Sequence, residues 1–265
     1  MGLLSLLATI IFCHATLWFI LAQIKKRNDL ADVAWGLGFL IVALVSFLSS
    51  GFDTDRGLIV TVLVGVWSLR LSLHIYLRNR NKTEDYRYQA WRMEWGKWFL
   101  IRSYLQVFLL QGFLLLVVSA PIIAIGIYRY MNLDYIVPMG VFDYIGIAIW
   151  IIGFLFESVG DAQLAKFLKN PENKGKLMQS GLWAYTRHPN YFGEATMWWG
   201  IWLIAFSTPY GPVSIVGPML ITFLLLKVSG VPMLEAKMSS HPDFPEYKAR
   251  VNMFVPWFPK NKNGK

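Results

Sequence analysis

The sequence predicts an all-α membrane protein with seven transmembrane helices, and three observations support this fold class. First, 55% of the 265 residues are hydrophobic and only 15% are charged, whereas soluble domains carry about 25% charged residues. Second, apolar runs of the length that a helix needs to cross a bilayer recur along the chain. Third, lysine and arginine gather in alternate connections, as expected of a chain that crosses a membrane repeatedly.

The candidate spans alternate with short polar connections. In chain order they cover residues 3–24, 30–50, 57–77, 98–126, 139–159, 190–208 and 211–230. The fourth run is longer than a bilayer requires, and we expect Pro121 to kink or end it. The polar connections are too short to build a second core, so we expect one membrane-embedded domain over residues 1–265.

The charge of the connections predicts the orientation in the membrane. Four connections are rich in lysine and arginine: residues 25–29, 78–97, 160–189 and the tail from Lys237. The intervening connections hold only Arg56 and Arg129. Because cytoplasmic connections carry the positive charge, the N-terminus is expected outside and the C-terminus in the cytoplasm.

The residue composition excludes several kinds of site. The single cysteine, Cys13, lies in an apolar run, so no internal disulfide can form, and the four histidines show no zinc spacing. We expect no metal centre. The net charge of +9 follows from the basic connections, so no nucleic-acid partner is expected. Residues 36–41 lack the third glycine of a Rossmann motif, so a nucleotide site would be of another kind.

Ionisable residues occur inside the apolar runs, where they are costly and usually functional. They are Asp32, Arg70, Arg102, Glu157, Asp161, Glu194 and Lys227. Arg102 and Lys227 are long enough to reach the headgroups, but the carboxylates are not. Glu157 and Asp161 share one helix face, as do Asn190 and Glu194. This spacing predicts a polar pocket that opens to the cytoplasm.

The side chains near this pocket favour a nucleotide ligand. The basic connections combine cations with aromatic rings: Arg70, Arg78, Arg80, Lys166, Lys169 and Arg187 with Tyr76, Tyr86, Tyr88, Trp183, Tyr185 and Tyr191. Cations suit phosphates, and aromatic rings suit a flat heterocycle. Contact with anionic lipids and an aromatic belt is the alternative interpretation. That alternative does not explain the neighbouring carboxylates.

Four stretches carry a resemblance to a known family. Residues 181–194, GLWAYTRHPNYFGE, resemble the signature of the steroid 5-alpha-reductase C-terminal domain superfamily. Three more stretches fit its bacterial uncharacterised branch: DLADVAWGLGF (29–39), WSLRLSLHIYLRNRNKTEDYRY (67–88) and EAKMSSHPDFPEYKARVNMFVPWFP (235–259). The resemblance covers nearly the whole chain. It implies a seven-helix protein of a bacterial inner membrane.

The resemblance also implies an activity and a cofactor. NADPH would lie in a cavity facing the cytoplasm, and a hydrophobic substrate, a steroid or another enone, would enter from the lipid. Such enzymes transfer a hydride to a C=C bond conjugated to a ketone, which requires a fixed nicotinamide. The positions matching the family's cofactor residues are Arg70, Asp161, Tyr185, Asn190 and Glu194. The motif adds Arg187, His188 and Tyr191, and the tail adds Tyr247 and Arg250.

The family's catalytic pair is a glutamate near the second helix and a tyrosine on the third. Asp32 is the best match for the glutamate and is one methylene shorter. Trp67 occupies the tyrosine position, and its indole N–H can donate a hydrogen bond but cannot act as an acid. Tyr76 would replace it only in a different helix register. We therefore expect Asp32, Trp67 and Tyr76 to be the candidate catalytic residues.

A second family shares part of the motif. The pattern RHPxYxG, here residues 187–193, also occurs in isoprenylcysteine carboxyl methyltransferases, which bind S-adenosylmethionine in a similar cleft. Glu194 directly after the motif, Asp161 on the preceding helix and the basic connection before the fourth span favour the reductase, because NADPH carries more negative charge. A methyltransferase and a lipid-binding protein without enzymatic activity stay as alternatives.

Overall fold

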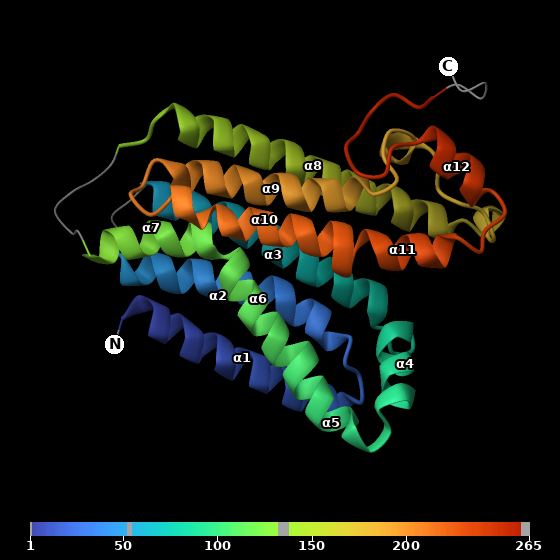
Figure 1. Cartoon of the computed structure of the whole chain (residues 1–265), viewed down its shortest axis with the longest axis horizontal. Helices are drawn as coiled ribbons and strands as arrows, with labels where there is room; N and C mark the ends of the chain where they lie inside the picture. Colours follow the sequence, from blue (N-terminus) through green and yellow to red (C-terminus); the bar gives the residue numbers. More distant parts are fainter. Residues whose placement is uncertain (1, 52–54, 132–137, 261–265) are drawn as a thin grey trace. The chain divides into compact units, whose positions relative to one another are not determined.

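The computed structural model describes residues 2–51, 55–131 and 138–260, and all regular elements in these residues are helices (Figure 1). Within the described residues, six helical stretches are long and apolar enough to cross a membrane. They are Leu3–Lys25, Leu30–Ser49, Asp55–Asn79, Tyr86–Val118, Val141–Lys169 and Pro212–Met238. The predicted all-α class and multi-pass membrane character are thus confirmed.

The predicted span over residues 190–208 is a helix, α9 (Pro189–Phe206), but it is not among these six stretches. It has 18 residues, and its first half carries Asn190, Glu194 and Thr196. These polar residues lower its mean hydropathy below that of the other spans. The count of seven transmembrane helices therefore stays a prediction, which depends on whether α9 crosses the membrane.

The fourth apolar run is divided differently from the prediction. One helical stretch covers Tyr86–Val118, through α4 (Tyr86–Trp95), α5 (Phe99–Arg102), a π-helical segment and α6 (Leu110–Val118). A separate helix, α7 (Ala120–Met131), follows. Pro121 lies in the first turn of α7, where its missing N–H group leaves no bond unmade. The predicted kink or end near Pro121 agrees with this break, but the run 98–126 is not one continuous helix.

The chain forms two compact units, which are described separately. The first comprises Met1–Asp143 and Ile204–Gly217, and the second comprises Tyr144–Leu203 and Pro218–Lys265. In the first unit, α2 (Leu30–Ser49) packs against α1 (Leu3–Lys25), α3 (Asp55–Asn79) and α7. A Cβ atom on Gly36 would lie 2.4 Å from Ser72 Oγ, so this glycine permits the close approach of α2 and α3.

A buried ion pair links the start of α3 to Asp143 within the first unit. Arg56 donates from Nε and Nη2 to the two carboxylate oxygens of Asp143, at 2.7 and 2.8 Å. Arg56 also donates to the carbonyl of Pro138 at 3.1 Å. Both charged side chains are almost completely buried. The positive charge of Arg56 is therefore neutralised inside the protein.

In the second unit, α8 (Val141–Lys169) and α9 approach each other closely along a row of glycines. Gly146, Gly153 and Gly160 recur every seven residues on α8, and Gly193 and Gly200 do so on α9. A Cβ atom on Gly153 would lie 2.6 Å from the carbonyl oxygen of Gly193. Small residues allow such backbone approach between membrane helices.

Further helices of the second unit follow in the sequence. Pro218 begins its second chain segment, within α10 (Val216–Phe223), and α11 (Val231–Met238) and α12 (Phe244–Arg250) come next.

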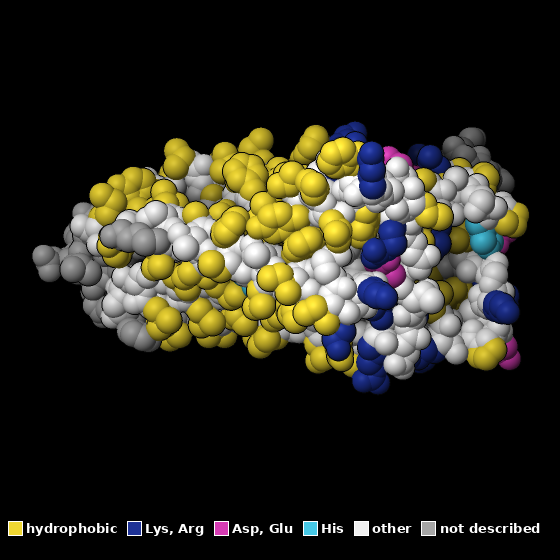
Figure 2. Space-filling model, turned by 90° about the horizontal axis from the view of Figure 1, so that it is seen from below, with side chains coloured by type: hydrophobic (Ala, Val, Ile, Leu, Met, Phe, Trp, Pro, Cys, Tyr) yellow, Lys and Arg dark blue, Asp and Glu magenta, His cyan; other side chains and the backbone are white. Residues whose placement is uncertain are grey.

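The exposed side chains match those of a lipid-facing protein. Hydrophobic side chains cover much of the face in Figure 2, and lysine and arginine gather toward one end of it. On α1, Leu4, Phe12, Leu17, Ile20 and Ile24 are exposed. A patch of this extent on a soluble monomer would be unusual. Its natural solvent is the hydrocarbon core of a bilayer.

Candidate functional site

A polar pair joins α8 and α9 within the second unit. Asn190 Nδ2 donates to Asp161 Oδ1 at 3.1 Å, and both residues are partly exposed. Glu157, one turn earlier on α8, is buried, and Glu194, one turn later on α9, is partly buried. The spacing predicted polar faces on these helices. The structure brings one predicted cofactor residue from each face, Asp161 and Asn190, into direct contact.

The glycine row explains why these polar groups can meet. A Cβ atom on Gly193 would lie 2.4 Å from the backbone nitrogen of Glu157, and one on Gly160 would lie 3.4 Å from that of Asn190. With no side chain at these positions, α8 and α9 come close enough for short side chains to bridge them. The carboxylate of Asp161 and the amide of Asn190 together offer acceptors and donors at one place.

Arg187 connects the loop before α9 to the last helices of the second unit. Its Nε and Nη2 donate to Glu235 Oε1 at 2.8 and 2.6 Å, and its Nη1 donates to the carbonyls of Lys248 and Val251. The side chain is nearly buried. These contacts hold residues from α11 and α12 against the loop, so Arg187 anchors the site rather than presenting an open guanidinium.

His188 is fully buried beside this ion pair. Its Nε2 lies 3.4 Å from Glu235 Oε1, and its ring stacks on Tyr191 with centroids 5.7 Å apart. Burial lowers the pKa of His188 from 6.5 to about 4, although the hydrogen bond and charge of Glu235 oppose the shift. The imidazole is therefore neutral at physiological pH and acts as a packed polar group.

The tail covers the same loop through several hydrogen bonds. Tyr247 donates its hydroxyl proton to the carbonyl of Trp183 at 2.7 Å, and burial raises its pKa. The backbone N–H of Trp257 donates to the carbonyl of Tyr185 at 2.9 Å, while the Tyr185 side chain stays exposed. Arg250 lies at the surface, 3.6 Å from Glu246. Tyr247 is thus a buried support, and Tyr185 and Arg250 are accessible.

In the first unit, Asp32 is bound on both of its carboxylate oxygens. Tyr88 donates its hydroxyl proton to Oδ1 at 2.8 Å, and Arg87 Nη2 donates to Oδ2 at 2.7 Å. Tyr88 is buried in a cluster formed with α1 and residues near the π-helical segment. The predicted acid therefore belongs to an Asp–Tyr–Arg cluster between α2 and α4.

The other predicted residues of the first unit lie along α3. Trp67 is 2% exposed and packs edge-on against Phe39, with centroids 5.4 Å apart. Arg70 is partly buried one turn later. Tyr76, by contrast, is 50% exposed and lines an open groove near the end of the helix. Their predicted roles toward substrate and cofactor stay predictions.

Arg87 and Glu235 had no assigned role in the prediction, and Tyr88 was expected only as one of the aromatic rings that suit a flat heterocycle. Arg87 and Tyr88 stood in a stretch that carried the family resemblance, but their link to Asp32 spans more than 50 positions. Glu235 begins the tail stretch and lies 48 positions from Arg187. Spacing within one helix indicates shared faces, and it carries no information about such distant pairs.

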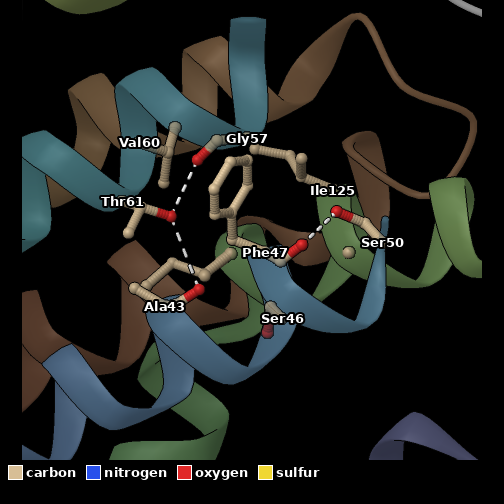
Figure 3. Close-up of a pocket in the computed structure, with 10 residues that line it drawn as sticks. Ala43, Ser46, Phe47, Ser50, Gly57, Val60, Thr61 and Ile125 are labelled. Atoms are coloured by element: carbon tan, nitrogen blue, oxygen red, sulfur yellow. Dashed lines mark hydrogen bonds between the residues drawn. The ribbon is translucent and has the colours of Figure 1, made fainter. Parts of the chain in front are cut away.

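The first unit also contains a small cavity among α2, α3 and α7, shown in Figure 3. Thr61 donates to the carbonyl of Gly57 at 2.8 Å, and Ser50 donates to that of Phe47 at 2.7 Å. The free volume is about 10 Å³. That space holds no more than about one water molecule. This cavity is a packing feature between helices and cannot accept a substrate.

The apolar helices and polar contacts define a multi-pass helical membrane protein. The chain matches the model of the family described as "Protein of unknown function (DUF1295)" over residues 18–251 and belongs to that family, which is related to steroid 5-alpha-reductase-like proteins. It is also 24% identical over 261 residues to the uncharacterised protein C594.04c of Schizosaccharomyces pombe, covering 89% of this chain and 72% of the yeast protein. No solved structure matches the chain.

Proposed function

We propose that this protein is an NADPH-dependent membrane reductase that transfers a hydride to an activated C=C bond of a hydrophobic substrate. The observation that supports this most is the contact of Asp161 with Asn190, because a position matching the family's cofactor Asp meets one matching its nicotinamide Asn. The membership of a family related to steroid 5-alpha-reductase-like proteins agrees with it.

The donors and acceptors of the α8–α9 contact fit a nicotinamide. A carboxamide group offers one acceptor and two donors, and an amide beside a carboxylate complements both. Asn190 and Asp161 would hold this group, with Glu194 one turn away. Lys166 and Lys169, in the last turns of α8, would favour the phosphates electrostatically. NADPH would supply the hydride when bound.

The remaining residues of the second unit would position the site. Arg187, His188 and Tyr247 fix the loop through buried contacts with Glu235 and backbone carbonyls. Tyr185, Tyr191 and Arg250 keep surface through which they would contact the cofactor. A rigid support of this kind favours catalysis because the cofactor must be held in one orientation.

The proposed reaction also needs a group that polarises the substrate carbonyl. Tyr88 and Arg87 donate to the two carboxylate oxygens of Asp32, the match for the family's glutamate, and would hold this side chain in one orientation. We propose Asp32 with Tyr88 for this role, with Trp67, Arg70 and Tyr76 as further candidates on α3. The substrate would enter from the lipid of a bacterial inner membrane, and the cofactor would enter from the cytoplasm.

The first experiment measures cofactor binding in detergent by thermal shift. NADPH, NADH and S-adenosylmethionine are compared, and a ligand at 100 times its Kd adds about 2.7 kcal/mol of stability. We expect NADPH to raise the melting temperature of the wild type but not of Asn190→Ala. Asn81→Ala is the matched control, because it makes the same chemical change at an exposed position just after the end of α3.

The outcomes separate the alternatives. Stabilisation by S-adenosylmethionine alone would replace the reductase by a methyltransferase with the same RHPxYxG loop. If NADPH raised the melting temperature of Asn190→Ala as much as that of the wild type, the α8–α9 contact would not be part of the cofactor site. No response to any of the three would favour a lipid-binding protein. If NADPH binds, turnover of a panel of flat enones by Asp32→Asn tests the catalytic assignment, and full turnover would contradict it.

A further inference from the structure

An open groove of about 310 Å³ lies at one end of the first unit, and none of its lining residues belongs to the α8–α9 contact. It is formed by the end of α1, the start of α2 and the end of α3. Its lining residues are Leu21, Lys25, Arg27, Asp29, Leu30, Val33, Tyr76, Asn79 and Arg80. The residues combine an aliphatic wall with a charged rim, which is the composition of a site for an amphiphile.

Along both α1 and α3, the side chains at the groove change from aliphatic to cationic toward the C-terminal end of the helix. On α1, Leu17, Leu21 and Lys25 follow one another at intervals of four residues and share one face. Leu17 is exposed one turn before Leu21, so the aliphatic stripe begins on the lipid-facing surface and ends at Lys25. A chain lying along α1 would meet the positive charge only at this end.

The stripe on α3 repeats this order. Leu69, Leu73, Tyr76 and Arg80 lie at intervals of three or four residues, and the two leucines and Tyr76 are exposed. The sequence again passes from aliphatic side chains through a tyrosine to a cation. Tyrosine at this depth is typical of the interface between hydrocarbon and headgroups.

The floor of the groove contributes no net charge. Arg27 pairs with Asp29, with Nη2 and Oδ2 at 2.6 Å, and Arg27 also donates to the carbonyl of Asn79 at 3.0 Å. This network connects the loop after α1 with the end of α3. Lys25 and Arg80 remain as the uncompensated positive charges of the groove among its lining residues.

We propose that this groove binds one anionic phospholipid. Lys25 and Arg80 contact its phosphate, Tyr76 lies at the level of the ester groups, and an acyl chain follows the stripes of α1 and α3. The aliphatic stripes favour a lipid over free phosphate, and the charged rim favours an anionic over a zwitterionic headgroup. This inference does not depend on the proposed reductase activity.

The test measures lipid retention by native mass spectrometry of the full chain in detergent. Dioleoyl phosphatidylglycerol and dioleoyl phosphatidylcholine are titrated separately, because they share acyl chains and differ in headgroup charge. We expect one phosphatidylglycerol per chain with at least tenfold weaker binding of phosphatidylcholine. The double variant Lys25→Gln/Arg80→Gln should lose this preference by about tenfold, since each cation near a headgroup strengthens its binding.

The control is Arg78→Gln/Lys82→Gln, which removes the same charge from neighbouring positions outside the groove. It should keep the wild-type preference, and unchanged melting temperatures should confirm that both variants fold. If both double variants lost the preference for phosphatidylglycerol equally, general surface charge would explain the binding and the proposed site would be wrong. Displacement of the lipid by millimolar inorganic phosphate would identify a phosphate site instead, and retention by Lys25→Gln/Arg80→Gln would refute the proposal.

Discussion

His188 combines complete burial with a titratable ring, and this makes the stability of the second unit depend on pH. Its native pKa is about 4 against an ordinary value of 6.5. Between these values the unfolded chain binds a proton that the native protein does not. The free energy of unfolding therefore falls as the pH falls, by about 1.4 kcal/mol per pH unit and about 3 kcal/mol in total.

We expect the melting temperature of the wild type in detergent to decrease steeply from pH 6.5 to 4. His188→Gln keeps a polar side chain but removes the titrating group, so its profile should be flatter over the same interval. Parallel profiles of the two proteins would show that other groups cause the acid sensitivity.

Arg187 illustrates how one buried cation can hold a loop and a tail together. Arg187→Met leaves the partly buried Glu235 with only the longer contacts to His188 and Lys248, and it frees the carbonyls of Lys248 and Val251. Breaking a buried pair in this way costs about 3–5 kcal/mol. We expect the region from Glu235 to Lys260 to become sensitive to limited proteolysis under conditions in which the wild type resists.

The matched control is Arg250→Met, which removes an arginine from an exposed pair with Glu246. Its effect should stay below about 1 kcal/mol, because exposed pairs contribute little. The double variant Arg187→Met/Glu235→Leu should recover part of the protection, since no buried charge is then left alone. A tail that stays resistant in Arg187→Met would contradict the anchoring role.

At the scale of the elements, the approach of α8 and α9 depends on glycine. Gly193→Ala would put a Cβ atom 2.4 Å from the backbone nitrogen of Glu157, and the helix backbone cannot yield easily. We expect a loss of about 1–3 kcal/mol, the usual cost of overpacking. Melting of the purified protein measures it, and the response to NADPH should weaken because Asn190 and Asp161 are pushed apart.

A glycine of another helix provides the control for this substitution. Gly65 lies inside α3, where a Cβ atom would meet only the Leu40 side chain at an ordinary distance of 3.6 Å. Gly65→Ala should be neutral or stabilise the protein, because alanine favours a helix by up to about 1 kcal/mol over glycine. Equal melting temperatures of the Gly193→Ala and Gly65→Ala variants would show that close packing at Gly193 is unimportant.

At the scale of the whole molecule, the membrane topology depends on whether α9 crosses the bilayer. Cys13→Ser removes the single cysteine, and one new cysteine is then placed at Lys82, Lys174 or Tyr210. We expect Tyr210→Cys to react with an impermeant maleimide in intact cells and the other two to react only after lysis. Lys174 and Tyr210 flank α9, so labelling of both from one side would exclude a crossing.

The sequence by itself determined the membrane class and the bounds of the first three helices to within a few residues. The predicted runs 3–24, 30–50 and 57–77 correspond to helices Leu3–Lys25, Leu30–Ser49 and Asp55–Asn79. Hydrophobicity and length are properties of each segment alone, and a helix satisfies its own backbone hydrogen bonds in lipid. Pro121 likewise acted locally, by ending one helix and beginning the next.

Only the tertiary structure decided which polar residues meet. The sequence placed Asp161 and Asn190 on polar helix faces, but their contact required the glycines that bring α8 and α9 together. It gave Arg187 a ligand-binding role, whereas folding pairs it with Glu235, 48 positions away. Contacts between distant segments depend on how whole helices pack, and no local pattern of residue types specifies that packing.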